Sequence, residues 1–247
     1  MSEDLLKIEN LKVYADKKEI VKGITLSIKP GQTHVIMGQN GSGKSTLLNA
    51  LAGHPKYKAE GIAFFDGKDL LKMKPYERAR AGLFLAFQTP NEIPGVSLSS
   101  LLRRAYAARH GQEIAVADFE KLLYEKMELL GMDKAMAERG VNEGFSGGEK
   151  KRCEILQLAL LNPKLALLDE LDSGLDIDAL SKVAFALEKA KSPDTSLVIV
   201  THYARMLKNI KPDAVHIMRE GKIILSGSFE LACKLEEKGY SWINSSI

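Results

Sequence analysis

Short runs of apolar residues alternate with polar residues through the first forty positions of the chain. The runs LLKIENLKV at 5–13 and GITLSI at 23–28 follow the two-residue period of half-buried strands. The tighter run HVIM at 34–37 comes after Pro30 and Gly31, and its continuous apolar character is typical of a strand buried on both faces. The pattern therefore predicts an antiparallel sheet that leads into a buried strand.

Helical spacing replaces this alternation further along the chain. In STLLNALAG at 45–53, three leucines share one helical face and a glycine ends the run. From about Gln88 to Val141 the pattern is mostly helical. In ADFEKLLYEKMELLG the apolar residues again share one face, and Gly131 stands where a C-cap is expected. We expect a strand–loop–helix unit followed by a helical insertion.

Two further apolar runs, LALLDE at 165–170 and LVIVTH at 197–202, end in polar residues, as buried parallel strands do. Ligands collect at the carboxyl ends of such strands. No repeat, low-complexity segment or Gly/Ser-rich linker divides the chain. We predict a single α/β domain over 1–247. Its catalytic core and N-terminal antiparallel β subdomain cover about 1–87 and 159–247, and a helical subdomain covers about 88–158.

Composition narrows the class of protein. With 45% hydrophobic and 27% charged residues, the 247-residue chain is of an ordinary folded type. The 35 Lys+Arg and 32 Asp+Glu give a formal charge of +3 and are spread along the chain, so no nucleic-acid partner is implied. Cys153 and Cys233 lack the paired spacing of a zinc, redox or iron–sulphur site, and we expect buried thiols. With no signal sequence and no run of about 18 apolar residues, we expect a cytoplasmic protein without direct membrane insertion.

A glycine-rich loop carries the first candidate chemistry. GQNGSGKST fits G-x-x-x-x-G-K-[ST] and lies between the HVIM strand and the helix expected from about Ser45. Glycines let backbone N–H groups face phosphate oxygens, while Lys44 reaches the terminal phosphates and Ser45 can ligate Mg²⁺. The predicted ATP-binding residues of this loop are Gly38, Gln39, Asn40, Gly41, Ser42, Gly43, Lys44, Ser45 and Thr46.

Two carboxylates end the buried strand LALLDE. Asp169 is expected beside the phosphates, where it holds Mg²⁺ through water. Glu170 lies one residue closer to solvent and can orient a water molecule and accept its proton during in-line attack. Together with the phosphate loop, these residues predict Mg²⁺-dependent ATP hydrolysis.

A second glycine turn, FSGGEKKR at 145–152, has no role in a simple nucleotide-binding domain. Ser146 and Glu149 have the spacing of a capping box, so the helix that follows presents free N–H groups at its start. The segment resembles the signature motif of ABC-type ATPases. This resemblance implies a head-to-tail homodimer with two ATP molecules between the protomers. The residues implied to contact the ATP of the partner subunit are Ser146, Gly147, Gly148 and Glu149.

The resemblance extends in order from Tyr14 to His202. It implies that Tyr14 stacks on adenine and that Gln88 touches Mg²⁺ and the attacking water. It also implies that His202 contacts the γ-phosphate and braces the catalytic glutamate. The segment SGLD resembles the D-loop of the family, which crosses the dimer interface, and its residues are Ser173, Gly174, Leu175 and Asp176. The implied catalytic set is Glu170, His202 and Lys44, and the implied metal set is Ser45, Gln88 and Asp169.

Several segments are similar to one branch of this family, the SufC-type ATPases of the SUF iron–sulphur cluster assembly system. They are FQTPNEIPGV, GFSGGEKKR, LDSGLDIDAL, THYARML and LEEKGYSWI. The signature reads FSGGE where LSGGQ is commonest, and the D-loop has Gly174 where alanine is usual; both variations occur in that branch. The resemblance implies SufB-like and SufD-like scaffold partners that ATP-driven closure remodels, with the cluster held outside this chain.

Three other functions stay open from the sequence. An ATPase subunit of a membrane ABC transporter is the runner-up. A nucleotide-gated binding module without useful catalysis is a second alternative, although the set of Lys44, Asp169, Glu170 and His202 argues against it. A small-molecule kinase is a third, but it would have no use for a signature motif or a D-loop.

Overall fold

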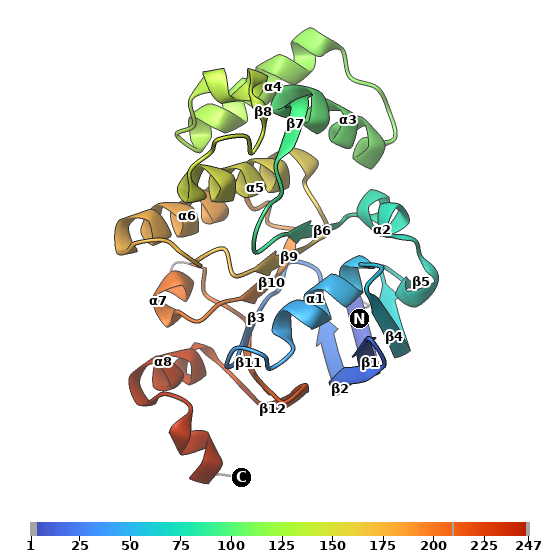
Figure 1. The fold of residues 1–247 in the computed structure, drawn as a ribbon, viewed down its shortest axis with the longest axis vertical. Helices are drawn as coiled ribbons and strands as arrows, with labels where there is room; N and C mark the ends of the chain where they lie inside the picture. The colour runs from blue at the N-terminus through green and yellow to red at the C-terminus, as the bar shows by residue number, and fades with distance from the viewer. Residues whose placement is uncertain (1–3, 209, 246–247) are drawn as a thin grey trace.

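The computed structural model describes residues 4–208 and 210–245. In Figure 1 the antiparallel N-terminal sheet lies beside the core strands, and helices α3 and α4 lie at the far end from the C-terminus. The described strands form a four-stranded sheet, a six-stranded sheet and a two-stranded ribbon. This arrangement is the predicted α/β fold with an antiparallel β subdomain and a helical insertion.

The N-terminal sheet is antiparallel, with the order β2-β1-β4-β5. Along its first strand, alternation buries Leu6 and Ile8 on one face and leaves Lys7 exposed on the other. Asp16 and Lys17 have positive φ angles of 47° and 69°, as the two central residues of a tight hairpin turn require. The strands of this sheet are β1 (Leu6–Ala15), β2 (Lys18–Ile28), β4 (Tyr57–Phe65) and β5 (Lys68–Asp69).

The core sheet has the order β12-β11-β3-β10-β9-β6, and all its neighbouring pairs are parallel except β11 and β12. Its strands are β3 (Thr33–Met37), β6 (Leu83–Ala86), β9 (Leu165–Asp169), β10 (Ser196–Val200), β11 (Ala214–Arg219) and β12 (Lys222–Gly227). Every residue of β3, β9 and β10 is buried, as the continuous apolar runs predict. Because parallel strands end at one edge, the loops after β3, β9 and β10 meet there.

The two faces of the core sheet belong to different hydrophobic clusters. Leu167 of β9 and Val198 of β10 pack in one cluster with Leu47 of α1 (Lys44–Ala52) and the antiparallel sheet. Their neighbours Leu168 and Ile199 pack in the other cluster, with helices α5 (Gly147–Leu161) and α6 (Ile177–Ala190). The helix that follows the phosphate loop and the helix that follows the signature segment therefore cover opposite faces of one sheet (Figure 1).

The segment between β6 and α5 contains helices α3 (Leu98–His110) and α4 (Val116–Leu129), which pack on α5. It also contains an antiparallel ribbon of β7 (Ile93–Ser97) and β8 (Gly140–Val141). The sequence analysis missed this ribbon because two-residue β8 is too short to show a period. The remaining helices are α2 (Pro75–Ala81), α7 (Ala204–Leu207) and α8 (Phe229–Lys238), with 3₁₀ turns at Leu70–Lys72, Lys134–Glu138 and Ser241–Ser245.

The two cysteines have different environments. Cys153 is buried in α5, and burial raises the pKa of its thiol to about 12. Cys233 is exposed, so the expectation that both thiols are buried was wrong for this residue. Helix α8 buries Ala232 and Leu235 and directs Cys233 to the opposite side.

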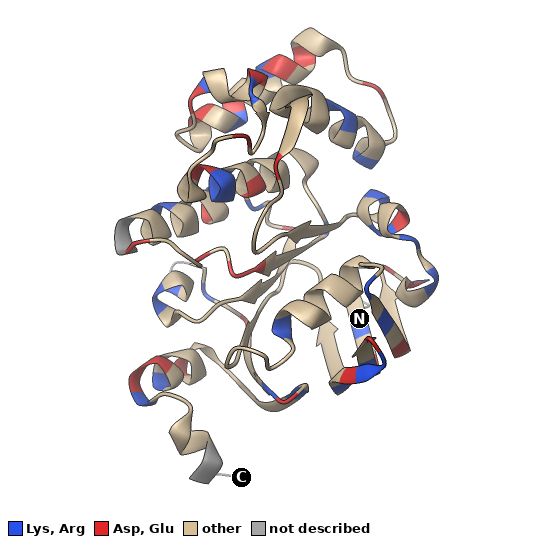
Figure 2. Cartoon of the chain, in the orientation of Figure 1, with Lys and Arg blue, Asp and Glu red and all other residues tan. Residues whose placement is uncertain are grey.

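Charged residues of both signs are interspersed over the helices and the outer sheet, with no long segment of one sign (Figure 2). Within the described part of the chain, no helix has the length and apolar character needed to cross a bilayer.

Candidate active site

The phosphate loop leaves β3 at Gly38 and is packed tightly against the end of β11. A Cβ atom added to Gly38 would lie 2.2 Å from the carbonyl oxygen of Met218, a distance that only glycine avoids. At Gly43 the φ angle is 104° and an added Cβ would lie 2.9 Å from Cε of Met218. The two glycines let the chain turn closely from the strand into helix α1, whose first residue is Lys44.

Lys44 folds back over the loop that precedes it. Its Nζ donates hydrogen bonds to the carbonyl oxygen of Gly38 at 2.8 Å and to that of Gln39 at 3.1 Å. Burial lowers the pKa of this ammonium, and the carboxylates of Glu170 and Asp169 oppose the shift. Lys44 therefore holds the loop in a curved shape and places a positive charge inside the curve.

Ser42 provides the test of whether a phosphate fits this loop. Its Oγ atom is buried and has no hydrogen-bond partner among the described residues. A buried hydroxyl without a partner costs about 1–3 kcal/mol, so native sites rarely keep one unless a ligand completes it. Phosphate oxygens accept from hydroxyl, ammonium and backbone N–H groups. The orphaned Ser42 hydroxyl beside the Lys44 ammonium therefore fits the polyphosphate of a nucleotide.

Ser45 and Asp169 form a pair of hard oxygen donors beside the loop. Ser45 Oγ donates to Oδ1 of Asp169 at 3.0 Å. Burial raises the pKa of Asp169 to about 6, while the bond from Ser45 acts in the opposite direction. Hydroxyl and carboxylate oxygens suit Mg²⁺, which takes other ligands from substrate phosphates and water. In residues 4–208 and 210–245, no group of three or more His, Cys, Asp and Glu side chains is placed to hold a metal by itself.

Glu170 leaves the end of β9 in a left-handed conformation, with a φ angle of 47°. Such a φ costs a non-glycine residue about 1–2 kcal/mol. The turn brings its carboxylate between two of the predicted residues: Oε1 lies 3.3 Å from Nε2 of His202, and Oε2 accepts from Nε2 of Gln88 at 2.5 Å. The structure thus brings together residues that follow three neighbouring strands, β6, β9 and β10. Gln88, predicted as a metal ligand, contacts Glu170 in this arrangement.

Two residues outside the predicted catalytic, ATP-binding and metal sets also belong to the site. The buried Asp172 accepts from Oγ1 of Thr201 at 2.6 Å and from the backbone N–H of His202 at 3.3 Å. The buried Lys151 donates to the carbonyl oxygen of Gln88 at 2.7 Å and to that of Glu170 at 3.2 Å. Asp172 fixes the backbone at His202, and Lys151 joins α5 to the two loops that carry Gln88 and Glu170. No local spacing reveals either contact, because each joins separate elements.

The signature segment forms the predicted capping box at the start of α5. Ser146 Oγ accepts from the Glu149 N–H at 3.3 Å, and Glu149 Oε2 accepts from the Ser146 N–H at 2.8 Å. The bonds that the Ser146 N–H and the Ser146 hydroxyl donate to Oε2 of Glu149 lower the pKa of this carboxylate. Ser146 and Gly147 are exposed. Across the described residues, no hydrogen bond or ion pair joins this segment to the phosphate loop of its own chain.

The predicted D-loop lies between Glu170 and helix α6. Ser173 N–H donates to the Glu170 carbonyl oxygen at 3.1 Å, and Asp176 caps α6 by accepting from the Ala179 N–H at 2.7 Å. Gly174 has a φ angle of 73° and is exposed. Tyr14 lies half-buried near the end of β1, where its phenol is hydrogen-bonded to Glu60.

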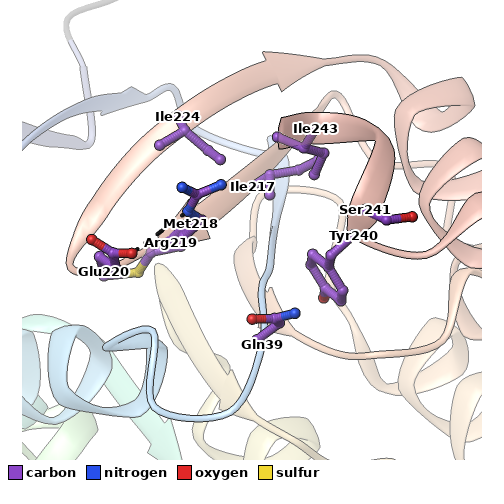
Figure 3. Close-up of a pocket in the computed structure, with 9 residues that line it drawn as sticks. All are labelled: Gln39, Ile217, Met218, Arg219, Glu220, Ile224, Tyr240, Ser241 and Ile243. Atoms are coloured by element: carbon purple, nitrogen blue, oxygen red, sulfur yellow. Dashed lines mark ion pairs between the residues drawn. The ribbon is translucent and has the colours of Figure 1, made fainter. Parts of the chain in front are cut away.

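A cavity of about 460 Å³ borders the phosphate loop on the side of the C-terminal segment (Figure 3). Gln39 and Tyr240 lie on one side of it, and the ion pair of Arg219 and Glu220, 3.8 Å apart, lies on another. The Gly38 backbone amide is hydrogen-bonded to the Tyr240 phenol, and burial raises the pKa of this phenol. None of the candidate catalytic carboxylates lines the cavity, which is thus separate from the chemistry at Glu170.

Comparison with known proteins gives the family. The family model described as ABC transporter matches residues 21–173. The chain is 50% identical to the Probable ATP-dependent transporter slr0075 of Synechocystis, over 100% of this chain and 98% of that protein. It is 51% identical to Vegetative protein 296 of Bacillus subtilis, over 100% and 96% of the two chains, and 51% identical to the Probable ATP-dependent transporter ycf16 of Cyanophora paradoxa, over 97% and 95%.

Solved structures agree with this assignment. A nucleotide-free ATP-binding cassette from an ABC transporter aligns with a TM-score of 0.75 at 26% identity, over 99% of each chain. A dimeric ATP-binding cassette bound to ADP and Pi aligns with a TM-score of 0.78 over 91% of this chain and 98% of the other, and at 23% identity this likeness concerns the fold alone. The chain belongs to the ABC transporter family of ATP-binding cassettes and is an ABC-type ATPase.

Proposed function

We propose that this ATPase is the ATP-hydrolysing subunit of a SUF-type iron–sulphur cluster assembly machinery. ATP-dependent dimerisation would change the conformation of a scaffold of SufB-like and SufD-like proteins in the cytoplasm. The observation that carries the hydrolytic part is the position of the Glu170 carboxylate between His202 and Gln88. The assignment to cluster assembly rests on the segments at 87–96, 144–152, 171–180, 201–207 and 235–243 that resemble SufC-type ATPases.

The proposed chemistry divides the residues by task. Lys44, Ser42 and the loop amides hold the phosphates, and Ser45 with Asp169 would hold Mg²⁺, which neutralises phosphate charge when bound. Glu170 accepts the proton of the attacking water. Its two oxygens have different neighbours, so one can stay bonded to His202 while the other faces the water that Gln88 helps to orient.

A head-to-tail homodimer is the assembly that we propose for the active state. The signature segment is exposed on α5, and α5 and α1 cover opposite faces of the core sheet. Among the described residues, Ser146 makes no hydrogen bond with the phosphate loop of its own chain. A second copy placed head-to-tail would supply this helix N-terminus, which favours anionic phosphate.

We further propose that the scaffold docks beside Gln88, on the helical subdomain that covers about 88–158. Phe87, Ile93 and Val96 are 48%, 40% and 37% exposed and lie on both sides of Gln88 in the sequence. Large apolar side chains gathered at one exposed place are typical of a protein interaction surface. A partner that moves this segment also moves the Gln88 amide away from Glu170, so docking and hydrolysis would be linked.

An ATPase subunit of a membrane ABC transporter is the competing proposal, and the names of two relatives, both probable ATP-dependent transporters, favour it. Detergent-free affinity purification from native cells, with mass spectrometry and an absorbance scan for iron–sulphur bands, separates the two. Recovery of two soluble, mutually related scaffold proteins supports cluster assembly. Recovery of a multi-span permease that needs detergent supports transport and overturns the assembly role.

Two matched variants make the affinity purification a test of the surface beside Gln88. Phe87→Ser combined with Ile93→Ser should lose the scaffold proteins, while Val116→Ser, which removes an equally exposed apolar group on α4, should retain them. Both proteins should bind ATP as the unchanged chain does, because the phosphate loop is untouched. Equal recovery of the scaffold with both variants would contradict docking beside Gln88.

A further inference from the structure

Glu154 is a buried carboxylate on α5 that the proposed hydrolysis does not use. Its side chain is 4% exposed, which is rare for a glutamate in a protein core. Oε2 accepts from the backbone N–H of Phe87 at 3.2 Å, and Oε1 accepts from Nε2 of Gln157 at 3.2 Å. Phe87 is the residue directly before Gln88, so this carboxylate contacts the backbone that carries the Gln88 side chain.

Helix α5 holds this backbone at two points. Glu154 receives the Phe87 N–H, and Lys151, one turn earlier on the same helix, donates to the Gln88 carbonyl oxygen at 2.7 Å. The two bonds fix the Ala86–Phe87 peptide unit, which comes before Phe87, and the Gln88–Thr89 peptide unit, which directly follows the Gln88 side chain. That side chain is exposed, and its Nε2 atom donates to Oε2 of Glu170 at 2.5 Å. The direction of the Gln88 side chain is therefore set by its own backbone and by helix α5, which is hydrogen-bonded to that backbone.

We propose that Glu154 is a positioning residue for ATP hydrolysis, which holds the backbone at Phe87 so that the Gln88 amide meets the carboxylate of Glu170. Because Glu154 and Ser146 lie on the same helix, the contact also joins the start of α5 to the attacking-water side of the site. A shift of α5 would reach Gln88 through this bond. The proposal concerns the ATPase itself and does not depend on which partner the protein serves.

Position 154 needs a glutamate rather than an apolar residue because strand β6 ends just before Phe87, whose N–H requires an acceptor. β6 is the edge strand of the core sheet and ends at Ala86, so the Phe87 N–H lies beyond the strand ladder and needs another acceptor. A leucine of similar size would remove the carboxylate that accepts this N–H. Burial raises the pKa of Glu154 to about 7, but a carboxyl oxygen accepts the Phe87 N–H whether the group is ionised or neutral.

Steady-state ATPase kinetics of the full chain test the proposal. Glu154→Leu, which removes the acceptor, should lower kcat about tenfold and change KM for ATP by less than about twofold, because Lys44 and Ser42 are untouched. Glu154→Gln keeps an oxygen that can accept and should restore kcat to within about twofold of the unchanged chain. Gln157→Ala removes the other partner of Glu154 without contacting the Gln88 segment, and serves as the control.

Hydrogen exchange gives a readout that does not rely on turnover. Peptides that cover 84–92 should exchange faster in the Glu154→Leu protein than in the Glu154→Gln and Gln157→Ala proteins, while peptides of α1 should exchange equally in all of them. The proposal is overturned if the Leu variant keeps its kcat. It is also overturned if kcat falls only as far as the fraction of protein that binds nucleotide falls, since that loss would reflect misfolding.

Discussion

Nε2 of Gln88 lies 2.5 Å from Oε2 of Glu170, although 82 positions separate the two residues in the chain. The contact follows from the order of the strands, because β6 and β9 are neighbours and run parallel. Each residue comes just after its strand, so both side chains reach the same edge of the sheet. His202 follows the next strand, β10, and completes a row of three polar side chains.

Glu170→Gln should lower kcat by about 10²–10⁴-fold, because the amide keeps the shape of the side chain but cannot take the proton of the attacking water. Binding of ATP, measured by equilibrium titration, should stay within about twofold, since Gln cannot disturb the Lys44 bonds to the loop. Lys44→Ala is the contrasting control and should lose ATP binding itself. Unaltered turnover of the Gln variant would favour a nucleotide-gated binding module over an enzyme.

Mixed dimers test the head-to-tail arrangement. Ser146→Arg places a bulky cation at the signature, and Lys44→Ala disables the phosphate loop, so each variant alone should be nearly inactive. In a mixed dimer, the intact loop of the Ser146 variant would meet the intact signature of the Lys44 variant. Mixing the two proteins should therefore recover a measurable part of the ATPase rate, scaling with the concentration of mixed dimer. If no mixture exceeds the sum of the separate proteins, the two sites do not share residues in this way.

Asp172→Ala should destabilise the fold and slow hydrolysis together. The substitution leaves the buried Thr201 hydroxyl and the His202 N–H without their shared acceptor, which costs about 1–3 kcal/mol. Urea denaturation measures the loss of unfolding free energy, and the ATPase rate under folding conditions measures the effect on His202. Asp172→Asn keeps an acceptor oxygen and should recover most of both quantities; an Ala variant as stable and as active as the unchanged chain would contradict the role.

A buried histidine pair should contribute stability that is lost on acidification. Nδ1 of His34 lies 3.0 Å from Nε2 of His216, and Nδ1 of His216 lies 2.8 Å from Oγ of Ser226. Burial lowers the pKa of His216 to about 4 and also lowers that of His34, where Asp213 partly opposes the shift. Lys191, which is also near Asp213, adds positive charge on that side.

The direction of this pH dependence follows from the protonation of His216 in the folded and unfolded chains. Unfolded His216 takes up a proton as the pH falls below its ordinary pKa of 6.5, whereas the folded residue stays neutral until about pH 4. The unfolding free energy, measured with urea, should thus carry a His216 contribution that drops by about 2 kcal/mol between pH 7 and pH 5, while the raised pKa values of Glu154 and Asp169 act in the opposite direction in every variant. His216→Asn should flatten this dependence, and His54→Gln, at an exposed turn, should keep it. An equal slope in the two variants would show that the buried pair is not its source.

The contacts predicted correctly from the sequence are those between residues that lie close together in the chain. The two residues of the Ser146–Glu149 capping box lie three positions apart, so spacing alone defines it. Asp172 and Glu154 were missed for the opposite reason. Their partners, Thr201 and Phe87, directly follow other strands, and a single buried acid gives no pattern before the strand order is known.

Because β9 ends at Asp169, the adjacent carboxylates of Asp169 and Glu170 have separate roles. If the strand continued, Asp169 and Glu170 would point to opposite faces of the sheet; instead the left-handed turn at Glu170 keeps both at its edge while aiming them at different neighbours. Asp169 bonds to Ser45 and Glu170 to His202 and Gln88. The two carboxylates therefore have separate hydrogen-bond partners, and the chain obtains a proton acceptor beside a cation ligand without a second strand to carry it.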